Sequence, residues 1–197
     1  QYGREPSTAL YPKDLPELKY GLPEFSIEMP YQPGDFTQIN ADLNAVMISR
    51  ALRLLDIQPN DRVADLFCGL GNFSLPMAKS GASVTGIEGL DSLVLRARQN
   101  ALRNSCVKYA SFEVADLFET DEQTVVSWGV FDKMLLDPPR SGAYAVVKSL
   151  HTPYLPKKIV YVSCNPSTFA RDAEVLVNKG YNFKSAGIMN MFAQTSH

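Results

Sequence analysis

Cys164 is the residue whose setting most plainly suggests chemistry. It follows an apolar, strand-like run at 158–163 and comes just before Asn165 and Pro166, which are typical of the cap and the first residue of a helix. The N-terminus of a helix favours negative charge, and the thiolate is the nucleophilic form of cysteine. We therefore predict that Cys164 is a catalytic nucleophile at the end of a strand.

Three carboxylates also stand at the ends of strand-like runs. Glu88 and Asp137 each end such a run, and Asp116 comes two residues after another. The carboxyl ends of parallel strands meet at one edge of a sheet, where ligands bind. We expect Glu88 to accept both hydroxyls of a ribose and Asp116 to meet an adenine amino group. Asp137 is expected to hold the methionine end of a cofactor or the substrate.

The segment DLFCGLGNFS (65–74) joins the first of these strands to a helix. Gly69 and Gly71 let the backbone turn tightly and approach a ligand. A dinucleotide-binding loop has a third glycine where this chain has Ser74, which disfavours a dehydrogenase. Asp65 suits a cationic ligand better than a pyrophosphate, and S-adenosylmethionine carries a cationic sulfonium.

A reactive thiolate beside a methyl donor indicates methylation of carbon. Carbon 5 of a pyrimidine is not nucleophilic, but addition of a thiolate to carbon 6 makes it so. A base then removes the proton from carbon 5 and the cysteine leaves. Methylation of oxygen or nitrogen would give Cys164 no task.

Strand-like runs alternate with helical patterns over most of the chain, which predicts a mostly parallel sheet with helices on both faces. Together with the glycine turn and the strand-end carboxylates, this α/β pattern resembles the Rossmann-like fold of class I S-adenosylmethionine-dependent methyltransferases. Residues 1–35, rich in proline and aromatic residues, are expected to form an arm with a short edge strand in PEFSIEMP (23–30), and 36–197 the catalytic domain. Strands are expected at 63–67, 83–88, 109–114, 131–137, 158–163 and 181–188, and helices at about 41–55, 91–104 and 166–178.

Composition narrows the class of protein. The chain has 197 residues, 45% of them hydrophobic, and a net charge of −2, which gives no basic footprint for nucleic acid. No apolar run of about 18 residues is present, so no membrane partner is expected. Cys68, Cys106 and Cys164 form no Cys-x-x-Cys pair, so we expect no metal site, no disulfide framework and a cytoplasmic location. Cys68 and Cys106 are expected to be buried filler.

Five segments occur in a characteristic order, and SCNP following DPPR is the most specific feature. They are DFTQIN (35–40), DLFCGLGNFSLP (65–76), DPPRSGA (137–143), IVYVSCNPSTFARD (159–172) and MFAQTSH (191–197). In these segments the chain closely resembles the uracil-5 RNA methyltransferases, the TrmA and RumA group. LPEF (22–25) with DFTQIN and IVYVSCNPSTFARD is most similar to the branch that acts on large-subunit ribosomal RNA. The tRNA branch, which shares DPPRSG, stays open.

The resemblance implies an enzyme that uses S-adenosylmethionine to methylate carbon 5 of a uridine in RNA, with no protein partner implied. It makes Cys164 the nucleophile, places Phe36 beside a flipped-out base, and lets Arg140 touch phosphate or base. The cofactor site implied by the resemblance adds Gln38, Phe67 and Asn72 to Glu88, Asp116 and Asp137, beside the loop of Asp65, Gly69 and Gly71.

The chain also departs from the family. The family's last motif ends with a histidine, one further residue and the glutamate that serves as general base, so this glutamate would lie two residues after His197. Ala193, Gln194 and Ser196 stand where Pro, His and Gly are usual. We therefore expect the chain to bind cofactor but to be poorly active or inactive by itself.

The family's N-terminal RNA-binding module, and the iron–sulfur segment of its ribosomal branch, would precede Gln1. An iron–sulfur cluster is therefore expected only there, and part of the RNA contact as well. Within this chain, Arg140, Lys157, Lys158 and Arg171 would supplement that contact.

Two other classes of protein remain to be distinguished. An amino-group methyltransferase of the Asp-Pro-Pro-aromatic type, acting on adenine or guanine, would have an aromatic residue at Arg140 and no use for Cys164. A non-catalytic module that only binds RNA or protein would keep its function after Asp137→Ala or Cys164→Ala.

Overall fold

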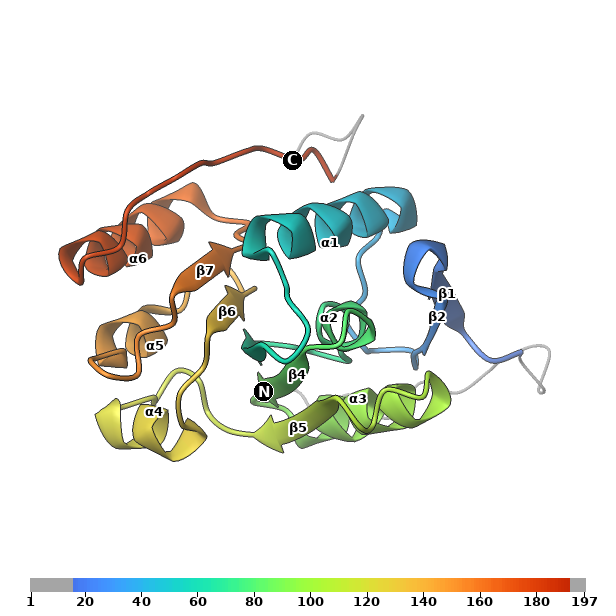
Figure 1. Ribbon diagram of the computed structural model, residues 1–197. Helices are drawn as coiled ribbons and strands as arrows, with labels where there is room; N and C mark the ends of the chain where they lie inside the picture. Colours follow the sequence, from blue (N-terminus) through green and yellow to red (C-terminus); the bar gives the residue numbers. More distant parts are fainter. Residues whose placement is uncertain (1–15, 192–197) are drawn as a thin grey trace.

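The computed structural model describes residues 16–191, and its centre is a sheet of five parallel strands in the order β5-β4-β3-β6-β7 (Figure 1). An antiparallel pair, β1 and β2, lies apart from it. The strands are β1 (Lys19–Leu22), β2 (Ile27–Pro30), β3 (Arg62–Leu66), β4 (Ser83–Glu88), β5 (Ala110–Val114), β6 (Lys133–Leu136) and β7 (Lys158–Tyr161). This sheet confirms the predicted α/β fold and five of the six expected strands.

Helices cover both faces of the sheet, so the domain has three layers (Figure 1). Two separate apolar clusters form, one with α1 to α3 on one face and one with α4 to α6 on the other. The helices are α1 (Ala41–Leu55), α2 (Ser74–Lys79), α3 (Asp91–Arg103), α4 (Glu122–Trp128), α5 (Tyr144–Ser149) and α6 (Pro166–Asn178), with a short 3-10 turn η1 (Pro23–Phe25) inside the hairpin.

Alternation along the central strands explains the two clusters. Val63 of β3 and Leu135 of β6 face the α1 side, whereas Leu66, Met134 and Leu136 face the α4 side. Successive side chains of a strand point to opposite faces, so a strand buried on both faces reads as a continuous apolar run. The strand ends are consequently the places where polar side chains gather.

Two helices begin at side-chain caps, and the cap predicted for α6 is confirmed. The Asn40 side chain accepts a hydrogen bond from the Leu43 amide at 3.0 Å, and α1 begins at the next residue. The Asn165 side chain accepts one from the Ser167 amide at 3.0 Å, and Pro166 is the first residue of α6. Both contacts satisfy amides that the first turn of a helix leaves unpaired.

The hairpin of β1 and β2 packs on the main domain. Leu22, Ile27 and Met29 are fully buried and belong to the same apolar cluster as α1 and α3. The expected strand in PEFSIEMP exists as β2, and its partner β1 was not predicted. The first 15 residues of the expected arm lie outside the described residues.

The prediction of a strand at 181–188 is wrong. The chain after α6 runs back over the domain without regular structure up to residue 191 (Figure 1). A strand needs a neighbour for its backbone groups, and none pairs with this segment among the described residues. Contacts are made by side chains instead: the Phe183 ring lies 6.3 Å from that of Phe169, and Met189 packs against the cluster on the α1 face.

No helix between residues 16 and 191 combines the length and apolar character needed to cross a membrane.

Candidate active site

The turn after β3 has the backbone that the glycine spacing predicts. Gly69 and Gly71 adopt φ of 55° and 95°, in the left-handed region that favours glycine. Phe67 adopts φ of 64° although it has a side chain, and its amide bonds the Ile87 carbonyl at 2.9 Å. Backbone strain of this kind at a strand end is typical of a ligand site.

The carboxylate of Glu88 closes this turn from the neighbouring strand. One of its oxygens accepts from the Gly69 amide and the other from the Leu90 amide, both at 3.1 Å. The two bonds fix the carboxylate at the carboxyl end of β4, and each oxygen keeps a lone pair. Each oxygen of Glu88 can therefore still accept a hydrogen bond from a ribose hydroxyl, as the predicted role requires.

Asp65 is the most buried charge at this edge. Its side chain is inaccessible, and one oxygen accepts a hydrogen bond from the Ser74 hydroxyl. The other oxygen, Oδ1, has no hydrogen-bond partner among the described residues. Burial, with smaller contributions from Asp137 and Glu88, raises the pKa of Asp65 to about 7. An unpaired buried carboxylate oxygen is suited to a cationic or hydrogen-donating ligand.

Asp137 stands one residue beyond β6, level with the end of β3, and its amide bonds the Leu66 carbonyl at 3.3 Å. The residue is partly exposed, but its carboxyl group lies buried at the strand end, where it accepts no hydrogen bond from a described residue. Burial raises the pKa of Asp137 to about 7. Asp65, Glu88 and Asp137 therefore bring three carboxyl groups together at one edge of the sheet.

Asp116 is exposed after β5, and its Oδ1 accepts from the Phe118 amide at 2.9 Å. The Phe118 ring is 51% exposed and lies 5.6 Å from the Phe67 ring. The sequence analysis missed Phe118. The one sequence feature that could have identified Phe118 is its position two residues after Asp116, the expected contact of the adenine amino group.

Asn72 faces away from the strand ends toward α1 and the hairpin. It exchanges two side-chain hydrogen bonds with Asn44, at 2.9 and 3.0 Å, and accepts a third from the Tyr20 hydroxyl at 2.8 Å. Burial raises the pKa of Tyr20 above its ordinary value. If Asn72 contacts a cofactor, the contact would use its backbone or the side-chain N–H that Asn44 does not accept.

Gln38 and Phe36 precede α1. Gln38 is half-buried, and Phe36 is 74% exposed. Their segment is tied to α3 through Asp35, which pairs with Arg96 at 3.3 Å. Neither side chain contacts the strand-end carboxylates through a hydrogen bond between described residues, so their predicted roles stay predictions.

Cys164 is exposed at the end of β7, whereas Cys68 and Cys106 are buried. The carboxyl ends of β6 and β7 are neighbours, since Leu136 pairs with Tyr161. Burial raises the pKa of the thiols of Cys68 and Cys106, which keeps them neutral. The predicted contrast between one accessible and two inert thiols is confirmed.

Arg140 differs from the other three predicted RNA-binding cations. Lys157 pairs with Asp132, Lys158 with Asp56 and Arg171 with Asp172, whereas the Arg140 guanidinium pairs with no described carboxylate. Lys157 and Lys158 also stand at the start of β7, at the end opposite Cys164. Only Arg140 is therefore exposed, unpaired and next to the site.

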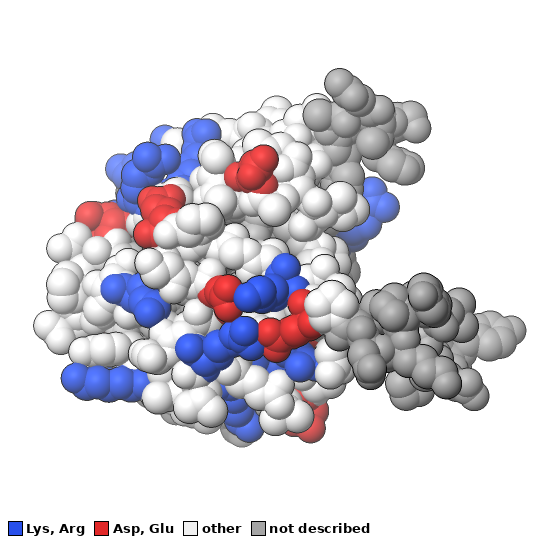
Figure 2. All heavy atoms as spheres, turned by 90° about the vertical axis from the view of Figure 1, so that its right-hand side faces the viewer, with Lys and Arg blue, Asp and Glu red and all other residues white. Residues whose placement is uncertain are grey.

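Charge is balanced on the face that carries the hairpin and the end of α3 (Figure 2). Lys19 pairs with Glu28 at 2.7 Å, and Arg103 pairs with Glu17 and Glu28 at 2.8 and 3.3 Å. Exposed pairs of this kind add little stability, but they compensate the positive charge of this face.

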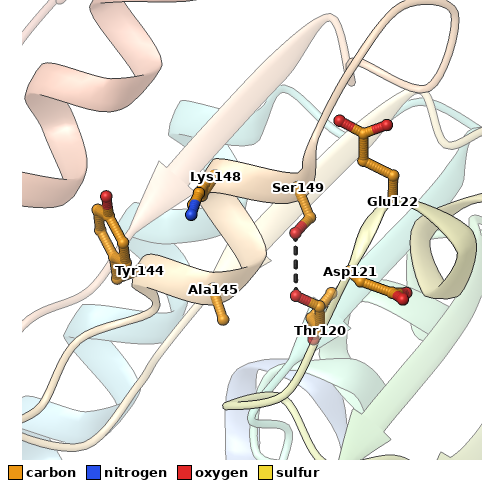
Figure 3. A pocket seen from close by; sticks show the side chains of 7 residues that line it. All are labelled: Thr120, Asp121, Glu122, Tyr144, Ala145, Lys148 and Ser149. Atoms are coloured by element: carbon orange, nitrogen blue, oxygen red, sulfur yellow. Dashed lines mark hydrogen bonds between the residues drawn. The ribbon is translucent and has the colours of Figure 1, made fainter.

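A surface hollow of about 360 Å³ lies between α5 and the start of α4 (Figure 3). The Ser149 hydroxyl bonds the Thr120 carbonyl at 2.9 Å across its floor. The hollow contains none of the predicted site residues and lies beside the site rather than in it. Its lining residues are Thr120, Asp121, Glu122, Tyr144, Ala145, Lys148 and Ser149.

Comparison with known proteins agrees with this geometry. The sequence profile described as tRNA (uracil-5-)-methyltransferase matches residues 24–197. The 23S rRNA (uracil(1939)-C(5))-methyltransferase RlmD of Neisseria lactamica is 69% identical over 97% of this chain and 42% of that protein. RlmD of Thiobacillus denitrificans is 57% identical over 99% of this chain and 45% of that protein. The chain thus spans less than half the length of these relatives.

A solved structure is also similar. The tRNA (uracil-54, C5)-methyltransferase of Pyrococcus abyssi, in complex with S-adenosyl-L-homocysteine, superposes with a TM-score of 0.69 at 31% identity. The match covers 81% of this chain and 38% of the other.

Proposed function

We propose that this chain, which belongs to the tRNA (uracil-5-)-methyltransferase family, is the nucleophile-bearing part of an enzyme that methylates carbon 5 of a uridine in RNA. The single observation that supports this most is the exposed Cys164 at the end of β7, beside the Asp137 end of β6. An amino-group methyltransferase has no use for such a thiol.

S-adenosylmethionine is the proposed methyl donor, and when bound it supplies an electrophilic methyl group on a sulfonium. The residues present fit it. Glu88 offers two fixed oxygens for ribose hydroxyls, Asp116 offers a carboxylate beside the Phe67 and Phe118 rings, and Asp65 has an unpaired buried oxygen. The S-adenosyl-L-homocysteine complex of the P. abyssi relative supports this assignment.

In the proposed reaction the thiolate of Cys164 would form a bond to carbon 6 of the uracil, and the electron pair gained by carbon 5 would form the bond to the methyl group. The sulfur–methyl bond of a bound donor would break in the same step, leaving a neutral thioether. A base then takes the proton from carbon 5, and the carbon–sulfur bond breaks to return the thiolate. Asp137 and Arg140 lie on the loop beside Cys164, where they can hold the uracil or its phosphate. The family resemblance assigns the role of this base to a glutamate of the family's last motif.

The proposed substrate is large-subunit ribosomal RNA, because the relatives from N. lactamica and T. denitrificans, each more than half identical to this chain, are named for a 23S rRNA uracil. The relation to a tRNA enzyme at 31% identity makes tRNA the alternative. A cytoplasmic site of action accords with three unpaired cysteines.

Trapping with 5-fluorouridine tests the proposal. Fluorine at carbon 5 cannot be removed as a proton is, so the adduct persists and migrates as a protein–RNA complex on a denaturing gel. We expect a complex with 23S rRNA fragments, mapped to Cys164 by mass spectrometry, and none with Cys164→Ala. Cys106→Ala, which removes a buried thiol, is the matched control and should trap normally. Trapping by Cys164→Ala, or methylated adenine among the products, would refute the assignment.

A further inference from the structure

Helix α6 and its cap residue hold the loop 137–143 at three of its backbone groups. The Arg140 carbonyl accepts a hydrogen bond from the side-chain amide of Asn165 at 3.0 Å and another from the Thr168 hydroxyl at 3.1 Å. The Ser141 carbonyl accepts from the Arg171 guanidinium at 2.9 Å. The Ala143 amide donates to Asp172 at 2.6 Å. The loop that begins with Asp137 is therefore attached to the helix that begins just after Cys164.

Asp172 is the centre of this attachment. Its side chain is completely buried, at 0% exposure, in the middle of α6. One oxygen accepts from the Ala143 amide and from the Tyr161 hydroxyl at 2.7 Å, while the other accepts from Arg171 at 2.7 and 2.8 Å. Its carboxylate thus joins β7, α6 and the end of the loop at one point.

Stability alone does not account for a buried carboxylate at this position. Desolvation of a buried ion pair costs about as much as the pairing returns, and an apolar residue of similar size is often as good. A fully hydrogen-bonded buried group instead defines one arrangement of the parts that it joins. The burial of the Tyr161 hydroxyl, together with its bond to Asp172, raises the pKa of this tyrosine, so it remains a donor to the carboxylate.

The loop 137–143 approaches the carboxylate of Asp172 closely at Gly142. Gly142 adopts φ of 79°, and a Cβ atom there would lie 2.6 Å from Asp172 Oδ2 and 2.7 Å from an Arg171 nitrogen. Arg171 itself lies over the Tyr144 ring at 5.0 Å, on the helix that the loop leads into. Glycine is thus required by the close approach of the loop to Asp172.

We propose that Asp172 is a positioning residue for the methyl transfer. By joining the Ala143 amide, Tyr161 and Arg171, it sets where Asp137 and Arg140 stand relative to Cys164. Asp172 itself does not contact the uracil or the cofactor. This inference rests on the proposed function, because it concerns the geometry of that same reaction.

The experiment compares Asp172→Asn and Tyr161→Phe with Asp132→Asn, in the chain extended to the length of its relatives. Asparagine presents an amide in place of one acceptor oxygen, so it breaks contacts on one side of Asp172. Tyr161→Phe keeps the carboxylate and removes only the two bonds of the tyrosine hydroxyl, one to Asp172 and one from the Ala143 amide. Asp132 is the matched control, because it also accepts a hydrogen bond from a backbone amide, that of Arg62 at 3.0 Å, but at the opposite end of the sheet. All variants are assayed at a temperature where circular dichroism shows them folded.

The first measurement is the single-turnover rate of RNA methylation at saturating S-adenosylmethionine. We expect Asp172→Asn to lower it by about 10- to 100-fold, the order found when reacting groups are misplaced by about 1 Å. Tyr161→Phe should lower it less, and Asp132→Asn should leave it unchanged. Affinity for S-adenosylhomocysteine, measured by calorimetry, should stay within about twofold in every variant, because the Glu88 end of the site is not attached to Asp172.

A rate for Asp172→Asn within about twofold of the unsubstituted protein would overturn the positioning role, as would an equal loss in Asp132→Asn. Failure of the underlying function looks different: the unsubstituted protein would then form no 5-methyluridine, or Cys164→Ala would retain its rate. A separate readout of geometry is the alkylation rate of Cys164, which should change in Asp172→Asn and not in Asp132→Asn.

Discussion

The side-chain amide of Asn165 donates a hydrogen bond to the carbonyl oxygen of Arg140 at 3.0 Å. The same side chain caps α6 through the Ser167 amide. One residue therefore performs two separable tasks: it begins the helix that follows Cys164 and holds the loop that carries Arg140.

The two tasks of Asn165 should separate in two variants. Asn165→Ala loses both bonds, and we expect the free energy of unfolding to fall by about 1 kcal/mol, the usual value of an N-cap. Asn165→Asp keeps the cap but has no donor for the Arg140 carbonyl, so it should unfold like the unsubstituted chain while its methylation rate falls. Thermal unfolding and single-turnover assays check this. Equal stability of the Ala and Asp variants would show that the cap contributes nothing.

Gly142→Ala should destabilise the chain more than Gly180→Ala. Both glycines have positive φ, 79° and 98°, so both substitutions incur the same kind of backbone penalty of about 1 kcal/mol. A Cβ at residue 180 meets nothing within 4 Å, whereas one at 142 lies 2.6 Å from Asp172. The difference in unfolding free energy in urea measures the contact alone. A difference of zero would mean that the loop moves away from α6 at no cost.

Glu88→Gln should weaken binding of S-adenosylhomocysteine by at least about tenfold, or about 1.4 kcal/mol. The substitution removes the charge and turns an amide group toward the Gly69 or Leu90 amide, both of which are donors. Glu113→Gln, an exposed residue on the neighbouring strand β5, is the control and should bind normally. Calorimetry on the chain itself suffices. Undiminished binding by Glu88→Gln would remove this carboxylate from the cofactor site.

Stability without ligand should fall between pH 5 and pH 8. The pKa of Asp65 and that of Asp137 are each raised to about 7 in the folded chain, chiefly by burial, against about 3.9 when unfolded. A raised carboxyl pKa contributes stability that is full below pH of about 4 and is lost as the pH rises through about 7.

Denaturant titrations at several pH values measure this loss. Asp137→Asn should flatten the profile, because it removes one of the two groups. Asp132→Asn should not flatten it in this range, since hydrogen bonds from the Arg62 amide and Lys157 lower the pKa of Asp132. A profile that rises from pH 5 to pH 8 would contradict the assignment of Asp65 and Asp137.

Iodoacetamide should modify one thiol per folded chain near neutral pH. Cys164 is exposed, whereas Cys68 and Cys106 are buried and have raised pKa values. Intact mass spectrometry should show a single adduct, absent in Cys164→Ala. Denaturation should make the thiols of Cys68 and Cys106 accessible to iodoacetamide as well. Rapid modification at Cys68 would instead reveal opening of the turn after β3.

The sequence was informative wherever one local pattern determined the structure. Apolar runs predicted the parallel strands, and strand ends then brought Glu88, Asp137 and Cys164 to one edge. Asn165 followed by Pro166 predicted the start of α6 to the residue. These features depend on neighbours in the chain, so they can be read without the fold.

The features that the sequence did not reveal depend on distant partners. Asp172 lies four residues from Thr168 and from Leu176, on the inward face of α6, but nothing local shows that Ala143 and Tyr161 meet it there. Asn72 was assigned to the cofactor, and its partners Asn44 and Tyr20 come from elements 28 and 52 residues away. The strand expected at 181–188 had a suitable pattern and lacked a neighbouring strand, which only the assembled sheet can show.

The attachment of the loop 137–143 to α6 has a consequence for comparing and engineering these enzymes. The segment from Asp137 to Asp172 behaves as one structural unit, because the backbone at Gly142 and Ala143 closely approaches the carboxylate of Asp172, 30 positions after Gly142. A chimera that imports a foreign loop without its helix will bring a side chain into that carboxylate or leave it without a donor. Transplants of RNA preference between branches should therefore exchange the whole segment.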